Sequence, residues 1–450
     1  MPLYTGRAQP YYYPNPRVSH PSMRKQRKLL LGIFGLPLCF LFVCLLFNSS
    51  KFQTHQRSFL SYTSPELLSI ENSLHQIGTH QNLAIFSVFF DRRLSDNQTE
   101  FRSLDGHLNG VLRIILVKKR GHQPQLRCLF DDGTLVSSRD LHGNLFSFYE
   151  LTENHQRLYG GYSVHCDVPP FVDLTKGVRI RADGSEVGEV FMPVIHANAS
   201  KIETLPSKMP KNTQYKHKFT VCVPALHHIT NLNAAFLADW LKVHIRLGVT
   251  KFRMYYSEVI PTSVKKVFTS IEDRAEVEFH PLYWKENNRA VIYESWYYIQ
   301  TMTVNDCLLR SLYDTEYAFF GDLDEVLVPH SVNISNWGEL VDRIWTDRNI
   351  PGICFPAFRF KESSSGMAKS LIRSSKIDSI RSKCLVRPNA IFEMGIHHIS
   401  KPYEETAILK PSKTVNIAFI HHYHRYAPKN HNNEIAGDET DASILRFLEK

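Results

Sequence analysis

Short apolar runs separated by polar turns occupy the chain from residue 82 to residue 200. The β-prone runs lie at 83–90, 111–118, 127–130 and 178–181. Asp132-Gly133 and Asp183-Gly184 follow two of these runs and are typical of hairpin turns. This pattern predicts a β-sandwich-like domain over residues 82–200. It leaves open whether the domain binds glycan or only braces the domain that follows.

After a Lys- and Pro-containing linker, residues 201–218, the spacing of apolar residues changes. Phe219–Val223 is a short apolar run, and the apolar residues at 232, 236, 240, 243 and 247 then recur at helical spacing before Gly248. Lys251–Tyr256 is the next β-prone run. These segments predict a strand–helix–strand unit with parallel strands. A helix at 264–271, a strand at 276–283 and a long helix at 290–313 are expected to continue it.

Tyr317–Pro329 is the stretch that carries candidate chemistry. An apolar run reaches Asp322, Asp324 and Glu325, and the chain then becomes apolar again up to the proline. Ligand sites of open α/β sheets lie beyond the carboxyl ends of strands. A hard divalent cation can be held there by one or two carboxylates together with substrate phosphates. The alternative interpretation is a solvated acidic turn, because Asp-x-Asp also occurs by chance.

The N-terminal segment predicts a membrane anchor. Residues 29–47 are almost entirely apolar, and Arg24, Lys25, Arg27 and Lys28 precede them. This length is about that of a membrane-spanning helix, and the positive flank favours a cytoplasmic N-terminus. We therefore expect a cytoplasmic tail at 1–28, an uncleaved signal anchor at 29–47 and a stem at 48–81. A cleavable signal peptide is less favoured, because its apolar region is normally shorter.

Net charge argues against nucleic-acid binding, and cysteine content agrees with a lumenal location. The formal charge is +9, but residues 1–28 contribute six basic residues and no acidic ones, which leaves +3 for the remainder. This remainder predicts no basic surface for nucleic acid. Outside the apolar segment there are six cysteines, which allow up to three disulfides in any of 15 pairings; Cys128 and Cys166 could join within the β-rich domain. Asn97, Asn198 and Asn333 lie in sequons and are candidate glycosylation sites of a glycoprotein.

Other motifs narrow the possible chemistry. The first strand of the second domain is followed by neither a dinucleotide-binding glycine motif nor a P-loop. The charge of a phosphorylated ligand would then be met by a metal at Asp322 and Asp324, and in a lumenal enzyme the suitable ligand is a nucleotide sugar. A second cluster contains Glu393, His397, His398, His421 and His422. Neutral imidazole is a ligand for Mn²⁺ or a general base, although any one of these histidines can equally be structural.

Taken in order, these blocks resemble glycosyltransferase family 92. The resemblance covers about residues 219–426, nearly half of the chain. It rests on six blocks: 238–244 with Gly248-Val249, Gln300 with 305–308, 320–325, 383–388, 394–398 and 422–425. Two positions depart from the family pattern, Asp239 where relatives usually carry Glu, and His424 between Tyr423 and Arg425.

The resemblance implies the fold, the reaction and the site residues. The expected fold class is α/β, with a GT-A-type nucleotide-sugar-binding catalytic domain at 219–450 behind the β-sandwich-like domain and the N-terminal transmembrane helix. The expected protein is a single-pass type II enzyme of the Golgi membrane. The implied reaction is inverting, Mn²⁺-dependent transfer of galactose from UDP-galactose in β-1,4 linkage to a glycan that carries galactose or fucose.

Site residues follow from the same resemblance. Asp322 and Asp324 are the implied metal–diphosphate pair, which His398 or His422 could complete. Tyr255 and Tyr256 could line the uridine pocket. Further substrate-binding candidates are Gln300, Asp306, Glu325 and Arg425, although Glu325 could instead be structural.

An inverting transferase needs a general base that accepts the acceptor hydroxyl's proton. Glu393 is the first candidate and Glu362 the second. Two other classes stay open. A lumenal nucleotide-diphosphate hydrolase would use the same metal site and release sugar without an acceptor. A non-catalytic glycan-binding membrane protein would use only the β-rich domain, although degenerate transferases often lose the acidic pair.

Overall fold

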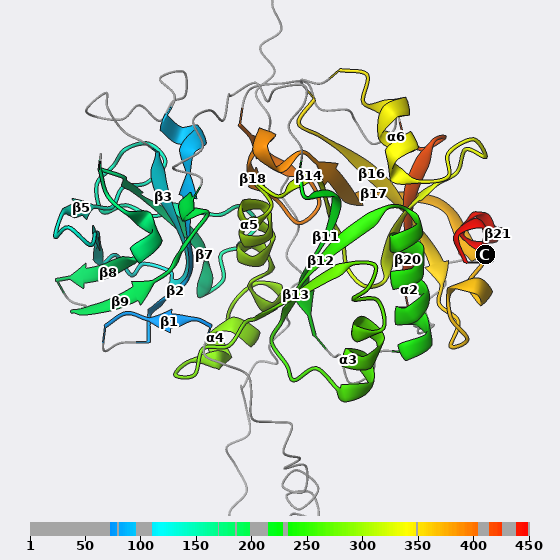
Figure 1. The fold of residues 1–450 in the computed structure, drawn as a ribbon. Coiled ribbons are helices and arrows are strands. Elements are labelled where there is room, and N and C mark those ends of the chain that lie inside the picture. Colours follow the sequence, from blue (N-terminus) through cyan, green and yellow to red (C-terminus); the bar gives the residue numbers. More distant parts are fainter. Residues whose placement is uncertain are drawn as a thin grey trace, which may run out of the picture. The chain divides into compact units, whose positions relative to one another are not determined.

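The computed structural model describes most of the chain beyond residue 72 (Figure 1). The described ranges are 73–78, 81–95, 110–169, 171–184, 187–198, 215–227, 233–347, 350–403, 414–424 and 438–448. All of them belong to one compact unit, residues 67–450. The domain boundaries predicted at residues 200 and 219 stay predictions.

The predicted fold class is wrong in its balance of elements. Strands hold 42% and helices 21% of the structure, which is mostly β and not an α/β domain behind a transmembrane helix. Among the described residues, no helix combines the length and the apolar character that a membrane crossing requires. This finding corrects the predicted single-pass Golgi membrane topology. The predicted anchor itself, residues 29–47, lies outside the described residues.

The N-terminal part consists of two sheets around a shared core. The six-stranded sheet has the order β1-β2-β3-β7-β6, with β10 beside β2, and the four-stranded sheet has the order β5-β4-β8-β9. Their bounds are β1 His75–Gln76, β2 Leu83–Asp91, β3 Val111–Lys119, β4 Gln125–Leu129, β5 Leu135–Ser137, β6 Tyr149–Glu150, β7 Tyr159–Asp167, β8 Val178–Asp183, β9 Gly188–Met192 and β10 Val194–Ile195. Gly133 and Gly184 have positive φ and form the expected hairpin turns β4–β5 and β8–β9.

β2 is buried along its whole length because both of its faces are covered. Val88 and Phe90 pack into the core between the two sheets. Phe86 and Phe89 belong to a second core, which they share with the helix α5, Gln300–Arg310, of the C-terminal part. This double burial explains why its sequence is continuously apolar and does not alternate.

The C-terminal part is built on a nine-stranded mixed sheet in the order β13-β12-β11-β14-β17-β16-β20-β15, with β21 beside β17. The bounds are β11 His217–Leu226, β12 Val249–Tyr256, β13 Glu276–Pro281, β14 Thr315–Phe320, β15 Glu325–Pro329, β16 Gly352–Lys361, β17 Ile372–Val386, β20 Ala418–His424 and β21 Asp438–Thr440; β18 Ile391–Met394 and β19 Ile399–Pro402 form a separate pair. β13, β12, β11 and β14 are parallel, as the strand–helix–strand pattern predicts, but β17 is antiparallel to β14.

Helices cover both faces of this sheet (Figure 1). The helices are α2 Ala234–Arg246, α3 Thr262–Thr269, α4 Asn288–Ile292, α5 Gln300–Arg310 and α6 Trp337–Ile344. α2, α3 and α6 share one core with the face of β11 that carries Val221 and Val223. α5 packs on the opposite face, through Cys307 and Leu308, and also contacts the six-stranded sheet of the N-terminal part.

The long helix expected at 290–313 is interrupted. α4 ends at Ile292, and α5 begins only at Gln300. Tyr297, Tyr298 and Ile299 all have positive φ, which is strained for residues with a side chain. The His155 ring lies 4.0 Å from the Trp296 ring, and the His227 ring stacks on Tyr298 at 4.6 Å. These tertiary contacts hold the interruption, which carries no glycine or proline signal.

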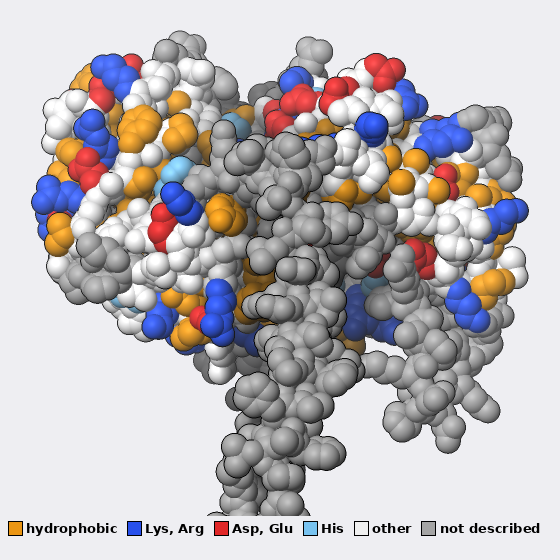
Figure 2. All heavy atoms as spheres, turned by 90° about the horizontal axis from the view of Figure 1, so that it is seen from below, with side chains coloured by type: hydrophobic (Ala, Val, Ile, Leu, Met, Phe, Trp, Pro, Cys, Tyr) orange, Lys and Arg blue, Asp and Glu red, His pale blue; other side chains and the backbone are white. Residues whose placement is uncertain are grey.

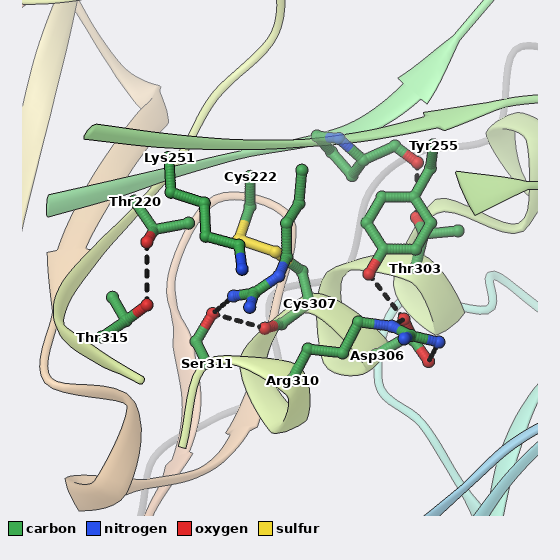
Figure 3. The surroundings of a disulfide bond; sticks show 12 residues. Thr220, Cys222, Lys251, Tyr255, Thr303, Asp306, Cys307, Arg310, Ser311 and Thr315 are labelled. Carbon is green, nitrogen blue, oxygen red and sulfur yellow. Dashed lines mark hydrogen bonds and ion pairs between the residues drawn. A yellow bond between two sulfur atoms is a disulfide. The ribbon is translucent and has the colours of Figure 1, made fainter. Parts of the chain in front are cut away.

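Within the described ranges, three disulfides join neighbouring elements: Cys128–Cys166, Cys222–Cys307 and Cys354–Cys384. The suggested Cys128–Cys166 pair is therefore confirmed. Cys222–Cys307 links β11 to α5 (Figure 3). Of the three candidate glycosylation sites, Asn198 and Asn333 are exposed, whereas Asn97 lies outside the described residues. Basic and acidic side chains are interspersed on the face shown in Figure 2.

Candidate functional site

The acidic turn lies between β14 and β15, at the carboxyl end of β14. Asp322 receives a hydrogen bond from Gln300 Nε2 at 3.3 Å and an ion pair from Lys383 Nζ at 3.0 Å. Gln300 is the first residue of α5, and Lys383 lies in β17. Two elements that are distant from each other in sequence, α5 and β17, therefore hold one carboxylate.

Lys383 also lies 3.2 Å from Glu325 Oε2, and both of these side chains are 1% exposed. Glu325 Oε2 accepts a hydrogen bond from the Asp322 backbone N–H at 2.9 Å. Burial raises the pKa of Glu325, and the neighbouring Asp322 and Asp324 charges add to this, against the effect of Lys383. The Glu325 side chain therefore lies in the protein interior and stabilises the turn through its bond to the Asp322 backbone.

Asp322 behaves differently. Burial alone would raise its pKa, but the Lys383 ammonium and its hydrogen bond outweigh burial and lower it. The same ion pair raises the pKa of Lys383 despite burial. Lys383 thus keeps Asp322 ionised in a site where a carboxylate could otherwise take up a proton.

Asp324 pairs with His422 of β20, with Nε2 to Oδ2 at 3.3 Å. The Asp324 backbone carbonyl accepts from the Tyr423 N–H at 2.7 Å, which ties the turn to β20. Burial would lower the pKa of His422, but the Asp324 hydrogen bond and the nearby carboxylates raise it. Asp322 and Asp324 remain partly accessible, with side chains 32% and 42% exposed.

The donor set fits a cation that is shared with a ligand. Two accessible carboxylates and an imidazole are suitable ligands for Mn²⁺. Within the described ranges, however, the acidic pair is not part of a three-ligand group whose ligand atoms all lie within 4.8 Å of one another. Asp322 and Asp324, with His422 beside them, would therefore hold the ion only together with oxygens of a bound phosphate.

Two predicted substrate-binding residues lie in the interior instead. The Tyr255 hydroxyl donates to Asp306 Oδ2 at 2.5 Å, and Arg310 also donates to Asp306 (Figure 3). Asp306 accepts a further hydrogen bond from the Ser87 hydroxyl. Tyr255 and Asp306 are fully buried. This network connects β12, α5 and β2. Tyr256 is half-buried and packs against Phe279 at 6.2 Å between ring centroids.

The remaining predicted residues lie in other elements or outside the described residues. His398 Nδ1 lies 3.7 Å from Glu153 Oε1, so the N-terminal part holds this side chain. Glu393 is fully buried and accepts from Tyr149 Oη at 2.5 Å and from the Thr152 N–H at 2.7 Å. Glu362 follows β16 and is partly exposed. Arg425 lies outside the described residues.

Of three further residues near the acidic turn, sequence reasoning assigns no role to Lys383 and Tyr297, whereas His397 belongs to the predicted histidine cluster. Lys383 is 61 positions from its partner Asp322, a separation that leaves no local pattern. Protonated His397 would lower the pKa of Asp322, but burial and Lys383 lower the pKa of His397 itself to about 4, so its imidazole is neutral near pH 7. Tyr297 is 49% exposed, and its pKa is raised to about 12 by burial and by the Asp322 and Asp324 charges. Its positive φ becomes visible only in the structure.

Comparisons with known proteins establish the family of the chain. The sequence profile of glycosyltransferase family 92 matches residues 217–447, just over half of the chain, and the chain belongs to that family. It is similar to the β-1,4-galactosyltransferase galt-1 of Caenorhabditis elegans, with 26% identity over 267 residues that cover 58% of this chain and 59% of the relative.

Two plant proteins match over shorter stretches. The galactan β-1,4-galactosyltransferases GALS3 and GALS2 of Arabidopsis thaliana are 27% identical over 195 residues and 23% identical over 219 residues. The matches cover 40% and 46% of this chain, and 37% and 40% of those relatives. The chain thus spans well under two thirds of each of these relatives.

Proposed function

We propose that this chain transfers galactose from UDP-galactose to a hydroxyl of a glycan that carries galactose or fucose, with inversion and formation of a β-1,4 linkage. Family membership supports glycosyl transfer, and the names of the three relatives suggest the sugar and the linkage. The observation that carries the proposal is the accessible pair Asp322–Asp324, with Asp322 held by Gln300 and Lys383.

Each residue of the pair has a distinct role in this proposal. Asp322 presents a fixed negative charge, because Lys383 lowers its pKa and Gln300 fixes its orientation. Asp324 is more exposed and is oriented by His422, so it can adjust to the donor diphosphate. A bound Mn²⁺ would supply Lewis-acid stabilisation of the diphosphate leaving group. The half-exposed Tyr297 would border the same space.

The surroundings of the two predicted carboxylates, Glu362 and Glu393, favour one of them as the general base. Glu362 is partly exposed beside the end of β16, a strand that pairs with the His422-bearing strand β20. Glu393 is enclosed, and both of its oxygens accept hydrogen bonds from the N-terminal part. We therefore favour Glu362 to accept the acceptor proton. Glu362→Gln should abolish transfer while UDP-galactose binding persists, whereas Glu393→Gln should mainly lower stability.

A transfer assay tests the proposal. Purified protein receives a panel of UDP-sugars with Mn²⁺ or a chelator, and acceptors that end in galactose or fucose, with products identified by mass spectrometry. Asp324→Asn should reduce transfer by about 100-fold or more if it helps to neutralise the leaving group. The matched control, Asp342→Asn, changes an exposed carboxylate of α6 and should leave transfer unchanged.

The other outcomes separate the alternative classes. Release of galactose without an acceptor product would favour a nucleotide-diphosphate hydrolase. Glycan binding without turnover of any donor would favour a non-catalytic glycan-binding protein. Transfer of a sugar other than galactose would retain the class of enzyme and reject the donor.

A further inference from the structure

His421 and His422 are neighbours in β20, but their side chains lie in different surroundings. Successive side chains of a strand point to opposite faces. His422 faces the acidic turn, whereas His421 faces away from it and is fully buried. There it meets His330, which directly follows β15, and Asp441, which directly follows β21. None of these three residues has a role in the proposed transfer reaction.

The three side chains converge closely. One ligand atom from each of His330, His421 and Asp441 lies within 4.8 Å of the other two. The Nε2 atoms of the two histidines are 3.1 Å apart, and His330 Nδ1 is 3.7 Å from Asp441 Oδ2. Ligand atoms of a tetrahedral zinc site, with bonds of about 2.0–2.1 Å, lie about 3.3 Å from one another. The separation of the two imidazole nitrogens is close to that value.

The rings are held in place before any ion binds. His330 stacks on Phe419, with ring centroids 3.6 Å apart, and His421 stacks on Phe360 at 4.0 Å. His421 Nδ1 lies 3.1 Å from the Tyr423 hydroxyl, a contact that can hold the proton on Nδ1 and leave Nε2 for a metal. Outer contacts of this kind fix the tautomer of metal-binding histidines.

Other charged and polar groups surround the cluster. Asp441 Oδ1 accepts from the Ser443 N–H and hydroxyl, and Arg373 Nε lies 3.2 Å from Asp441 Oδ2. Arg373 is also paired with Glu439 at 2.6 Å, so its charge is shared between two carboxylates. Each carboxylate oxygen can accept more than one contact, which leaves Asp441 capacity for a cation.

We propose that His330, His421 and Asp441 form a second divalent-cation site of the Zn²⁺ class, separate from the acidic turn. Two imidazoles and one carboxylate are an established ligand combination for Zn²⁺, with a fourth position for water. Without an ion, the Nε2 atoms of His330 and His421 can share one proton in a hydrogen bond; a bound ion would take the place of that proton. It would join β15, β20 and the segment after β21, and so fasten the C-terminal end of the chain to the sheet.

Zinc content measured on the purified full-length chain tests this site. The protein is loaded with Zn²⁺, passed through gel filtration in metal-free buffer and analysed by mass spectrometry for the metal. Wild type and Asp324→Asn should each retain about one Zn²⁺ per chain, as expected for a site with three protein ligands. His330→Asn should lose it. Asp324→Asn distinguishes this site from the acidic turn, so the result does not depend on the proposed reaction.

Thermal unfolding gives a second readout. Saturating Zn²⁺ should raise the Tm of wild type and of Asp324→Asn by about 3–6 °C, because an ion that binds only the folded chain stabilises it. If His330→Asn does not fold, Asp441→Asn, which preserves side-chain shape, replaces it. A Co²⁺ titration of wild type should also give the visible absorption of a four-coordinate imidazole site.

The following results would overturn the proposal. The first is that the wild type retains no Zn²⁺. The second is that Asp324→Asn loses the zinc while His330→Asn keeps it. The third is that the Co²⁺ spectrum with the protein is identical to that of Co²⁺ in buffer. Any of these would leave the three side chains as a structural hydrogen-bonded group.

Discussion

Lys383 is a buried cation between two carboxylates, and its removal should affect both the site and the fold. In Lys383→Met the fully buried Glu325 loses its ion-pair partner, which should reduce the free energy of unfolding by about 3–5 kcal/mol. The pKa of Asp322 should rise, since Lys383 is the group that lowers it against the effect of burial. The acidic limb of the profile of kcat/KM against pH should therefore move to higher pH.

Urea denaturation and a pH profile of transfer measure these two effects. Lys369→Met is the matched control, because Lys369 is exposed in the turn before β17. An unchanged acidic limb in Lys383→Met would show that Asp322 does not control the reaction through its ionisation.

Tyr255 offers a test between a substrate contact and a structural role. Its hydroxyl is enclosed and bonded to Asp306. Tyr255→Phe should lower the free energy of unfolding by about 1–3 kcal/mol, because it leaves a buried carboxylate with one bond fewer. The KM for UDP-galactose should stay within a factor of two. A KM that rises tenfold without loss of stability would instead support the uridine-pocket role predicted from the sequence.

At the scale of elements, two disulfides allow a matched comparison. Cys354–Cys384 joins β16 and β17 next to Lys383, whereas Cys128–Cys166 joins strands of the N-terminal part. Their loops are similar, with separations of 30 and 38 residues. Replacing either pair with serine should cost about 3–4 kcal/mol on the loop-entropy model.

Only the Cys354/Cys384 replacement should weaken donor binding, because only that disulfide fixes the strand that carries Lys383. Isothermal titration calorimetry with UDP-galactose, at a temperature where both variants are folded, measures the difference. Equal weakening in both variants would point to a general loss of rigidity.

The interrupted helix shows where local sequence stops being informative. Apolar spacing correctly indicated α2 and the parallel strands β11 and β12, since those elements depend on nearby residues. The same spacing predicted a continuous helix through Trp296–Ile299. Ring contacts from His155 and His227, which come from elsewhere in the chain, accompany the break there. Tertiary packing thus overrides local helical propensity.

At the scale of the whole molecule, the acidic turn could be found from sequence because its residues are contiguous. Of the side chains that contact it, Gln300 and His422 are candidates only through the family resemblance, and Lys383 has no predicted role. These three residues lie in α5, β20 and β17, so they share no local sequence pattern with the turn. The predicted fold class failed for a related reason. In the parallel half of the large sheet, strands and helices alternate regularly along the sequence. The other half consists of β16, β17, β20 and β15, which pair over long sequence distances, some parallel and some antiparallel.

Buried histidines should make the whole fold sensitive to acid. Burial lowers the pKa of His165 to about 3, with Arg113 and Arg139 adding to the effect, and lowers the pKa of His244 to about 4. Both side chains are neutral when folded, whereas in the unfolded chain they take up protons below about pH 6.5. The unfolded state therefore binds more protons between about pH 6.5 and 4, and stability falls as the pH falls through this window.

At pH 5 each of these two histidines should cost about 2 kcal/mol, a large part of a typical stability of about 5–15 kcal/mol. Urea midpoints at pH 7.5, 6 and 5 should therefore decrease steeply. His244→Phe keeps an aromatic ring against Trp240 and Trp337 but cannot titrate, so its midpoint should decrease less. His142→Gln changes an exposed histidine and serves as the control. If His244→Phe and wild type lose stability in parallel, proton uptake at His244 does not contribute to acid unfolding, and the cause lies in other groups.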